Sequence, residues 1–210
     1  SYIIGEQIRN QNVEKIKEVF RAVLIDELQD KLGNPDIKEL FTYSYFKDTG
    51  IELDKRFKRY FFARIEQFIA DNTAMNMRHC IYDLVKKTGS VNGFHIEHII
   101  ADNEENHHLF KDDPEFFQSQ RNRLGGLLLL KGKDNISSNN ETFDKKLESY
   151  ANTLYWNESL RSDSYKAKLD FQSMIEKFAL GFRPLDKFGP EELDERHRLL
   201  FNIAKIIWEA

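Results

Sequence analysis

An acidic residue and a histidine stand side by side in the segment Phe94–Ile100, which is Phe-His-Ile-Glu-His-Ile-Ile. Glu97 offers a carboxylate, the kind of oxygen ligand that a hard cation such as Mg²⁺ prefers. His98 offers an imidazole, which titrates near neutral pH and can take a proton from water. The pair predicts hydrolysis assisted by a divalent ion, with His98 as the general base.

A second metal-facing residue is predicted further along the chain. Asn135 follows His98 by 37 residues, and its side-chain oxygen can complete a metal site with Glu97. Asn139 or Asn140 takes this place if the spacing differs, and a turn role for Asn135 is the alternative. His95 shares strand parity with Glu97, so it either supports the site or makes a structural hydrogen bond.

Basic residues follow the Glu-His pair in the sequence. Segment 121–146 has six basic and three acidic residues, whereas segment 102–115 has six acidic residues and one lysine. We expect four side chains to line a path for DNA phosphates, namely Arg121, Arg123, Lys145 and Lys146. The alternatives are a solvated helix face for the two lysines and a contact with the acidic segment for Arg123. A further basic run over residues 55–64 indicates the solvent side of a helix, with DNA contact as the alternative.

The spacing of apolar residues predicts the elements that position these side chains. Strands are expected over 94–100 and 124–130, joined by a long polar loop over 101–120. Ser138 and Glu141 match a capping box, which predicts a helix that carries Phe143, Leu147, Tyr150 and Leu154 on one face. Further helices are expected over 11–32, 36–47, 54–71, 73–87 and 163–180, and from Gly189-Pro190 to the end. The fold class is therefore mainly α with a small embedded β hairpin.

Several short motifs together resemble a known family. They are Glu97-His98-Ile99, Arg123-Leu124-Gly125, Leu127–Leu130, Asn135, Phe143 and Lys146. They look like the C-terminal nuclease domain of GmrSD-type modification-dependent restriction enzymes, most strongly over residues 90–156. That domain is an HNH, or ββα-metal, nuclease.

The resemblance implies a ββα-metal (HNH) core surrounded by helices, which cuts DNA in defence against foreign DNA. His98 would be the general base, and Glu97 and Asn135 would face Mg²⁺ or Mn²⁺. The family's companion is an N-terminal ParB-like nucleotide-hydrolysing domain. The family usually has Pro where this chain has Ala101 and Asn where it has Gly126. The second change puts the bracing of the loop that orients the histidine in question.

The domain organisation and the composition limit the kinds of protein that this chain can be. We expect a helical part over 1–90, the nuclease core over 91–156 and helices over 157–210, in one domain of a longer chain that here begins at Ser1. The 40% of hydrophobic residues suffices for a core, and no stretch approaches the roughly 20 apolar residues that span a bilayer. The single Cys80 excludes an internal disulfide and a Cys-rich zinc site, suits the cytoplasm and is expected to be buried. The net charge of −4 argues against a protein that coats nucleic acid indiscriminately.

Two other functions explain the same residues. The first is a catalytically inactive HNH-like domain that binds DNA or regulates a partner. The second is a helical protein-interaction module in which the hairpin is only structural. Metal-dependent nicking that disappears in His98→Ala separates the enzyme from the first, and the second predicts no salt-dependent affinity for DNA.

Overall fold

The computed structural model describes residues 13–47, 50, 53–132, 141–166 and 169–209. The chain forms two compact units, one of residues 1–42 with Glu209 and one of residues 43–208 with Ala210. In the first unit, helix α2 spans Val13–Leu32, which confirms the helix predicted over 11–32. Gly33 follows α2 with a φ of 60°, and Gln29 donates hydrogen bonds to the carbonyls of Pro35 and Ile37, which fixes the turn after the helix.

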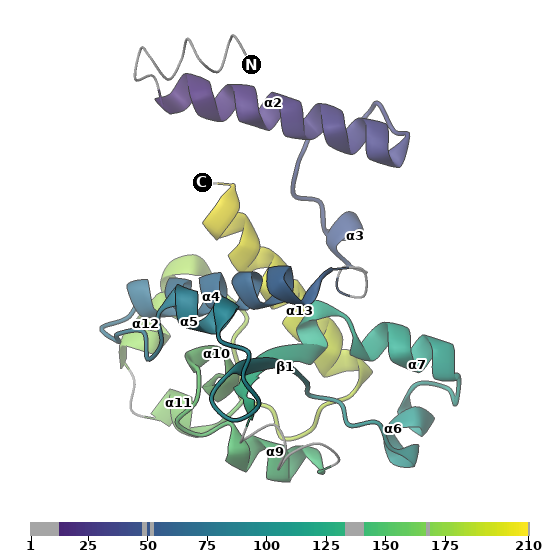
Figure 1. The fold of residues 1–210 in the computed structure, drawn as a ribbon, viewed down its shortest axis with the longest axis vertical. Coiled ribbons are helices and arrows are strands. Elements are labelled where there is room, and N and C mark those ends of the chain that lie inside the picture. Colours follow the sequence, from purple (N-terminus) through teal and green to yellow (C-terminus); the bar gives the residue numbers. More distant parts are fainter. Residues whose placement is uncertain (1–12, 48–49, 51–52, 133–140, 167–168, 210) are drawn as a thin grey trace. The chain divides into compact units, whose positions relative to one another are not determined.

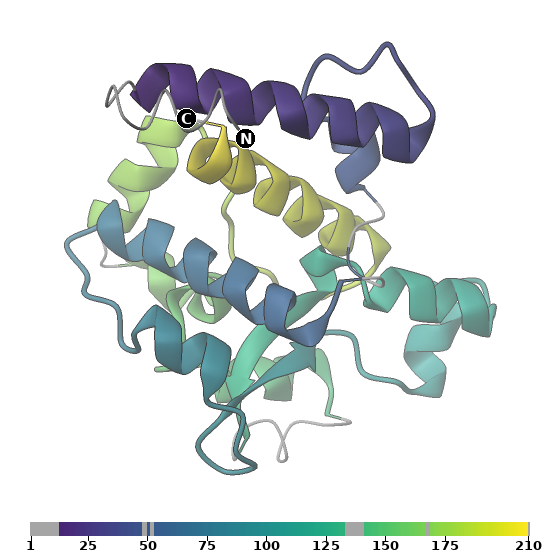
Figure 2. The ribbon, with the colours of Figure 1, turned by 45° about the horizontal axis from the view of Figure 1, so that its top comes forward.

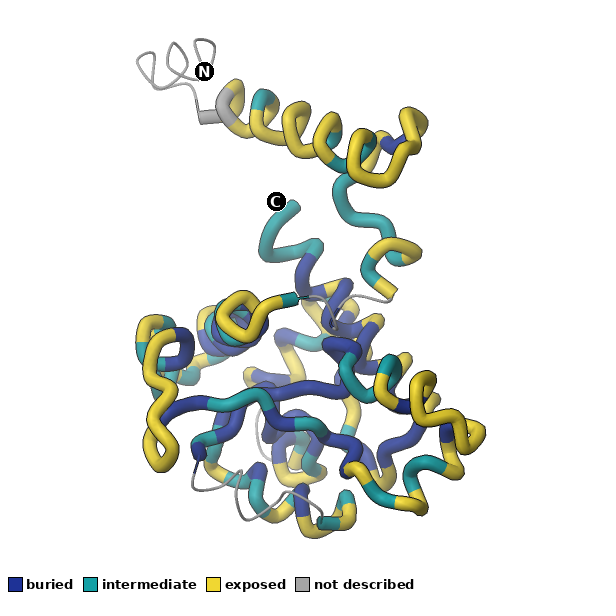
Figure 3. The backbone as a smooth tube through the Cα atoms, turned by 45° about the vertical axis from the view of Figure 1, so that its right-hand side comes forward, coloured by how far each residue is buried: buried dark blue, intermediate teal, exposed yellow. Residues whose placement is uncertain are grey.

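A two-stranded antiparallel hairpin lies in the second unit. Strand β1 (Phe94–His98) pairs with β2 (Leu127–Lys131), and His98 stands opposite Leu127. The apolar residues 127–130 of β2 are completely buried (Figure 3). Helices cover the hairpin because a strand that is apolar on both faces must be shielded from water on both. The prediction of a mainly helical chain with one small hairpin is confirmed.

Helix α4 (Lys55–Asp71) is one of the helices that pack on the hairpin (Figure 1). Asp54 begins the helix, since its side chain accepts hydrogen bonds from the amides of Arg56 and Phe57. Helix α13 (Pro190–Trp208) contacts α4, the short helix α3 (Tyr43–Phe46) and the 3₁₀ turn η1 (Leu124–Gly126) (Figure 2). The turn η1 leads directly into β2, so α13 supports the same end of the hairpin at which His98 lies.

The segment between the strands is helical, so the prediction of a loop over 101–120 is wrong. It forms α6 (Glu104–Leu109) and α7 (Pro114–Arg121). Asn103 caps α6 by accepting from the amide of Asn106, and Asp113 caps α7 just before Pro114. Acidic residues therefore lie in the first turns of both helices, namely Glu104 and Glu105 in α6 and Glu115 in α7. Their negative charges interact favourably with the positive ends of the helix dipoles.

Two of the other predicted helices are much shorter in the structure, and α3 occupies only Tyr43–Phe46 of the helix predicted over 36–47. The helix predicted over 73–87 is reduced to α5 (Ile81–Lys86), and Cys80 precedes it as an exposed residue, so its predicted burial is wrong. Helix α9 spans Phe143–Ser149 and begins after Thr142, whereas Ser138 of the predicted capping box lies outside the described residues. The remaining helices are α10 (Tyr155–Glu158), α11 (Asp163–Lys166) and α12 (Leu169–Phe178). No helix in the described ranges is long and apolar enough to cross a membrane.

Candidate functional site

His98 ends β1 and is held there by a side-chain hydrogen bond. Its Nε2 lies 3.0 Å from Oδ1 of Asn122, the residue that follows α7. The side-chain nitrogen Nδ2 of Asn122 donates to the carbonyl of Gln118 at 2.7 Å, and this bond turns the side-chain oxygen Oδ1 toward the imidazole. Neutral His98 therefore carries its proton on Nε2. Its Nδ1 has no hydrogen-bond partner among the residues that the structure describes, and this nitrogen can accept a proton.

Burial lowers the pKa of His98 from its ordinary value of 6.5 to about 4. The hydrogen bond with Asn122 opposes this shift, and the positive charges of Arg121, Lys146 and Lys58 add to it. His98 is therefore neutral at pH 7, with its lone pair available. A general base works best when its pKa lies near the working pH, and a nearby anion such as a DNA phosphate raises the pKa of His98 toward that range.

Glu97 and Lys146 form a buried ion pair directly beside His98. Nζ of Lys146 lies 2.6 Å from Oε1 of Glu97 and 2.6 Å from the carbonyl oxygen of His98. The side chains are 5% and 1% exposed, respectively. Lys146 thus links α9 to the end of β1. This burial contradicts the expectation that Lys146 lines a surface path for phosphates.

The three other predicted phosphate contacts differ in burial: Arg123 is buried, Arg121 is half-buried and Lys145 is exposed. Arg123 is 4% exposed and donates to the carbonyl of Lys47 and to the carboxylate of Asp194, so it braces the fold and its predicted DNA contact is corrected. Arg121 is half-buried and donates to the carbonyl of Ile100. Its guanidinium lies 3.3 Å from a carboxylate oxygen of Asp102. Lys145 is exposed on α9.

The remaining predicted site residues are His95 and three asparagines. His95 is half-buried, and its Nε2 lies 3.3 Å from the carbonyl of Gly89, which agrees with the structural alternative. Asn135, Asn139 and Asn140 lie outside the described residues. Sequence reasoning missed Asn122, because the segment before it was taken for a loop and its position after a helix that ends against β1 had no sequence signal.

The described residues by themselves do not make a complete site for a divalent cation. Among the described residues, no group of three His, Cys, Asp or Glu side chains is placed to hold a metal ion. Glu97 is the one predicted metal ligand in this part of the chain, and its carboxylate is paired with Lys146. The role of Glu97 and Asn135 as metal ligands therefore stays a prediction.

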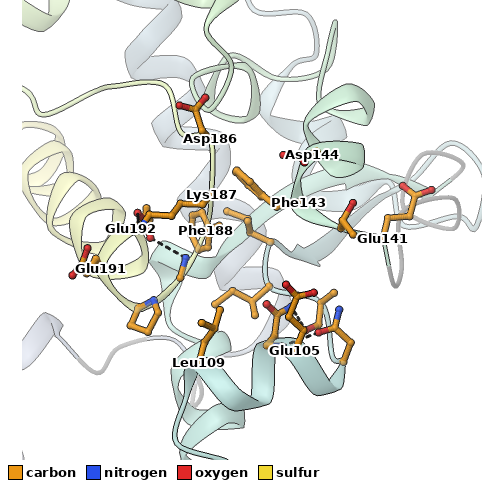
Figure 4. A pocket seen from close by; sticks show the side chains of 18 residues that line it. Glu105, Leu109, Glu141, Phe143, Asp144, Asp186, Lys187, Phe188, Glu191 and Glu192 are labelled. Carbon is orange, nitrogen blue, oxygen red and sulfur yellow. Dashed lines mark hydrogen bonds and ion pairs between the residues drawn. The ribbon is translucent and has the colours of Figure 1, made fainter.

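A pocket of about 620 Å³ begins at the residues that follow His98. The rings of Phe143 and Phe188 lie 5.6 Å apart at its centre (Figure 4). Six acidic side chains and one lysine line it, namely Glu105, Glu141, Asp144, Asp186, Glu191, Glu192 and Lys187. This concentration of negative charge is unfavourable for a phosphate group inside the pocket.

The fold and site define a class: a helical domain with a small hairpin, whose first strand ends in a neutral histidine that an asparagine side chain orients. Residues 34–203 match the model of one family, described as GmrSD restriction endonucleases, C-terminal domain. The match covers most of the chain, and the chain belongs to this family. No curated protein and no solved structure gives a significant match. Membership confirms the resemblance and implies a nuclease of the restriction type, with DNA as its substrate.

Proposed function

We propose that the chain is a metal-dependent DNA endonuclease of the HNH type in which His98 is the general base. The observation that carries the proposal is the hydrogen bond from Nε2 of His98 to Asn122, which leaves Nδ1 as the basic nitrogen. A water molecule beside Nδ1 gives its proton to His98 and attacks the phosphorus atom of a phosphodiester. Cleavage at the bond to the 3′ oxygen produces the 5′-phosphate and 3′-hydroxyl ends that the resemblance implies.

The Glu97–Lys146 pair supports this chemistry from the protein side. Because Lys146 binds the backbone carbonyl of His98, it fixes the end of β1 from which the imidazole projects. Mg²⁺ or Mn²⁺ enters the proposal through the family resemblance; Glu97 and Asn135 would face such an ion, which would stabilise negative charge on the leaving oxygen. The cytoplasmic location, the role in defence and a ParB-like companion domain in a longer protein belong to the same proposal.

Cleavage of supercoiled plasmid tests the function. The parent chain is incubated with Mg²⁺, Mn²⁺ or EDTA beside the His98→Ala variant. General-base catalysis contributes about 10²–10⁴-fold to a rate, so His98→Ala should lose most of the metal-dependent nicking. His95→Ala is the matched control, because His95 lies on the same strand with a structural contact. A parent that binds the plasmid without nicking it in any metal would support the inactive, regulatory alternative instead.

A further inference from the structure

Lys58 is a buried cation that the proposed function does not yet use. It lies in the first turns of α4 and is 8% exposed. It shares the buried side of the helix with Phe61, Phe62 and Ile65, which follow at helical spacing. The sequence indicated that this basic run lies on the solvent side of the helix, and for Lys58 that expectation is wrong.

The ammonium group of Lys58 is available to an anion. No hydrogen bond or ion pair joins it to another described residue, and Asp54 acts on it through its charge alone. Lys146, by contrast, has a carboxylate and a carbonyl as partners. Long basic side chains commonly bury their aliphatic stem while the charged end stays in contact with water. Lys58 can therefore receive an anion that the described residues do not supply.

Lys58 also lies near the reacting end of the hairpin. Helix α4 packs on β1, and the positive charge of Lys58 acts on His98 together with those of Arg121 and Lys146. Lys146 is committed to Glu97, and Arg121 shares its charge with Asp102. Among these three cations, Lys58 is the one without a hydrogen bond or ion pair to a described residue.

We propose that Lys58 binds a phosphate group of the DNA backbone beside His98, with Arg121 as the second cation of the same phosphate site. This inference rests on the proposed function, because it assigns the substrate contact at the same histidine. The aliphatic stem of Lys58 is packed against the core, so the ammonium group is positioned in advance and loses little rotamer freedom on binding. A phosphate contact of this kind is independent of base sequence and weakens with added salt.

The salt dependence of DNA binding tests the proposal without requiring cleavage. Binding of a fluorescent 20-base-pair duplex to the 210-residue chain is measured in EDTA over a series of salt concentrations. Each neutralised phosphate contributes about 0.9 to the slope of log K against log salt, so Lys58→Met should lower the slope by about that amount and weaken binding about tenfold at low salt. Lys58→Arg should keep most of the slope. Lys55→Met is the matched control, because Lys55 is exposed on the same helix.

An experiment on the parent protein covers the case in which Lys58→Met does not fold. The side-chain resonances of ¹³C-labelled lysines are recorded with and without the duplex, and Lys58 is assigned from the Lys58→Arg spectrum. A shift at Lys58 with none at Lys55 supports the proposal. An unchanged Lys58 resonance in saturating duplex, no binding by the parent, or an unchanged slope in folded Lys58→Met overturns it. Nicking that persists in His98→Ala refutes the general base and leaves these results standing.

Discussion

Replacing Lys146 by Met is expected to cost more stability than replacing any exposed lysine of this chain. The two side chains of the Glu97–Lys146 pair are at most 5% exposed, and their charged atoms lie 2.6 Å apart. Removing one partner of a buried ion pair costs about 3–5 kcal/mol, because the remaining buried charge, here that of Glu97, loses its nearest opposite charge. The lost hydrogen bond to the carbonyl of His98 adds about 1 kcal/mol. We therefore expect Lys146→Met to lower the free energy of unfolding by about 4–6 kcal/mol.

Urea unfolding followed by circular dichroism measures this change, and the thermal midpoint should fall by roughly 10–20 °C in a domain of this size. Lys145→Met is the control, since Lys145 is exposed and should change stability by less than about 0.5 kcal/mol. The double variant Glu97→Gln, Lys146→Met should be more stable than Lys146→Met by about 2 kcal/mol, because a buried carboxylate that has lost its lysine is replaced by a neutral amide. A Lys146→Met variant as stable as the parent, or a double variant no better than the single one, would refute the buried pair. A normal stability with a reduced salt slope for DNA binding would restore the phosphate contact predicted from the sequence.

Three further predictions concern the surroundings of the site. Asn122→Asp puts a negative charge next to Nε2 of His98 and should raise the pKa of His98. The acid limb of the cleavage pH profile should then move up by about 1–3 units. The other charged groups that act on His98 are Arg121, Lys146 and Lys58. An unmoved acid limb in a folded variant would contradict the hydrogen bond. Burial raises the pKa of Glu66 from 4.5 to about 7, so its contribution to stability is present below pH 4.5 and is lost as the pH rises through 7. Glu66→Gln should therefore gain about 3 kcal/mol relative to the parent between pH 4 and pH 8 in urea unfolding, and a constant difference would exclude this titration. Gly126→Asn introduces the residue that is usual in the family. A Cβ at this position meets the carbonyl of Arg121 at 3.0 Å and a methyl group of Leu193 at 3.2 Å. We therefore expect thermal unfolding to show a free energy of unfolding lower by about 1–3 kcal/mol, with no gain in cleavage.

The elements that carry the site were largely predictable from local patterns. A run of four leucines can form a short strand only if it is buried, and β2 indeed begins at Leu127. The spacing of apolar residues gave α4 to within one residue at its start. The segment 101–120 was predicted wrongly because its acidity was read as a sign of a loop, although Asn103 and Asp113 are helix caps that the same sequence contains.

The candidate site was predictable in its chemistry but not in its contacts. The adjacent carboxylate and imidazole of Glu97 and His98 drew attention to the correct strand. The neighbour of the imidazole, Asn122, is set by the way in which α7 ends against β1. This contact could not be predicted from the sequence, because the two residues are separated by two helices and share no local pattern.

Residue order alone determined the places of α2, α4 and the two strands, because the patterns that decide them extend over a few neighbouring residues. Only the tertiary structure decided what each charged side chain does. Lys145 and Lys146 are neighbours in the sequence, yet one is exposed and the other is buried against a carboxylate 49 residues away. The reason is that the energy of a charge depends on the water and the opposite charges around it, and both are set by packing between distant segments.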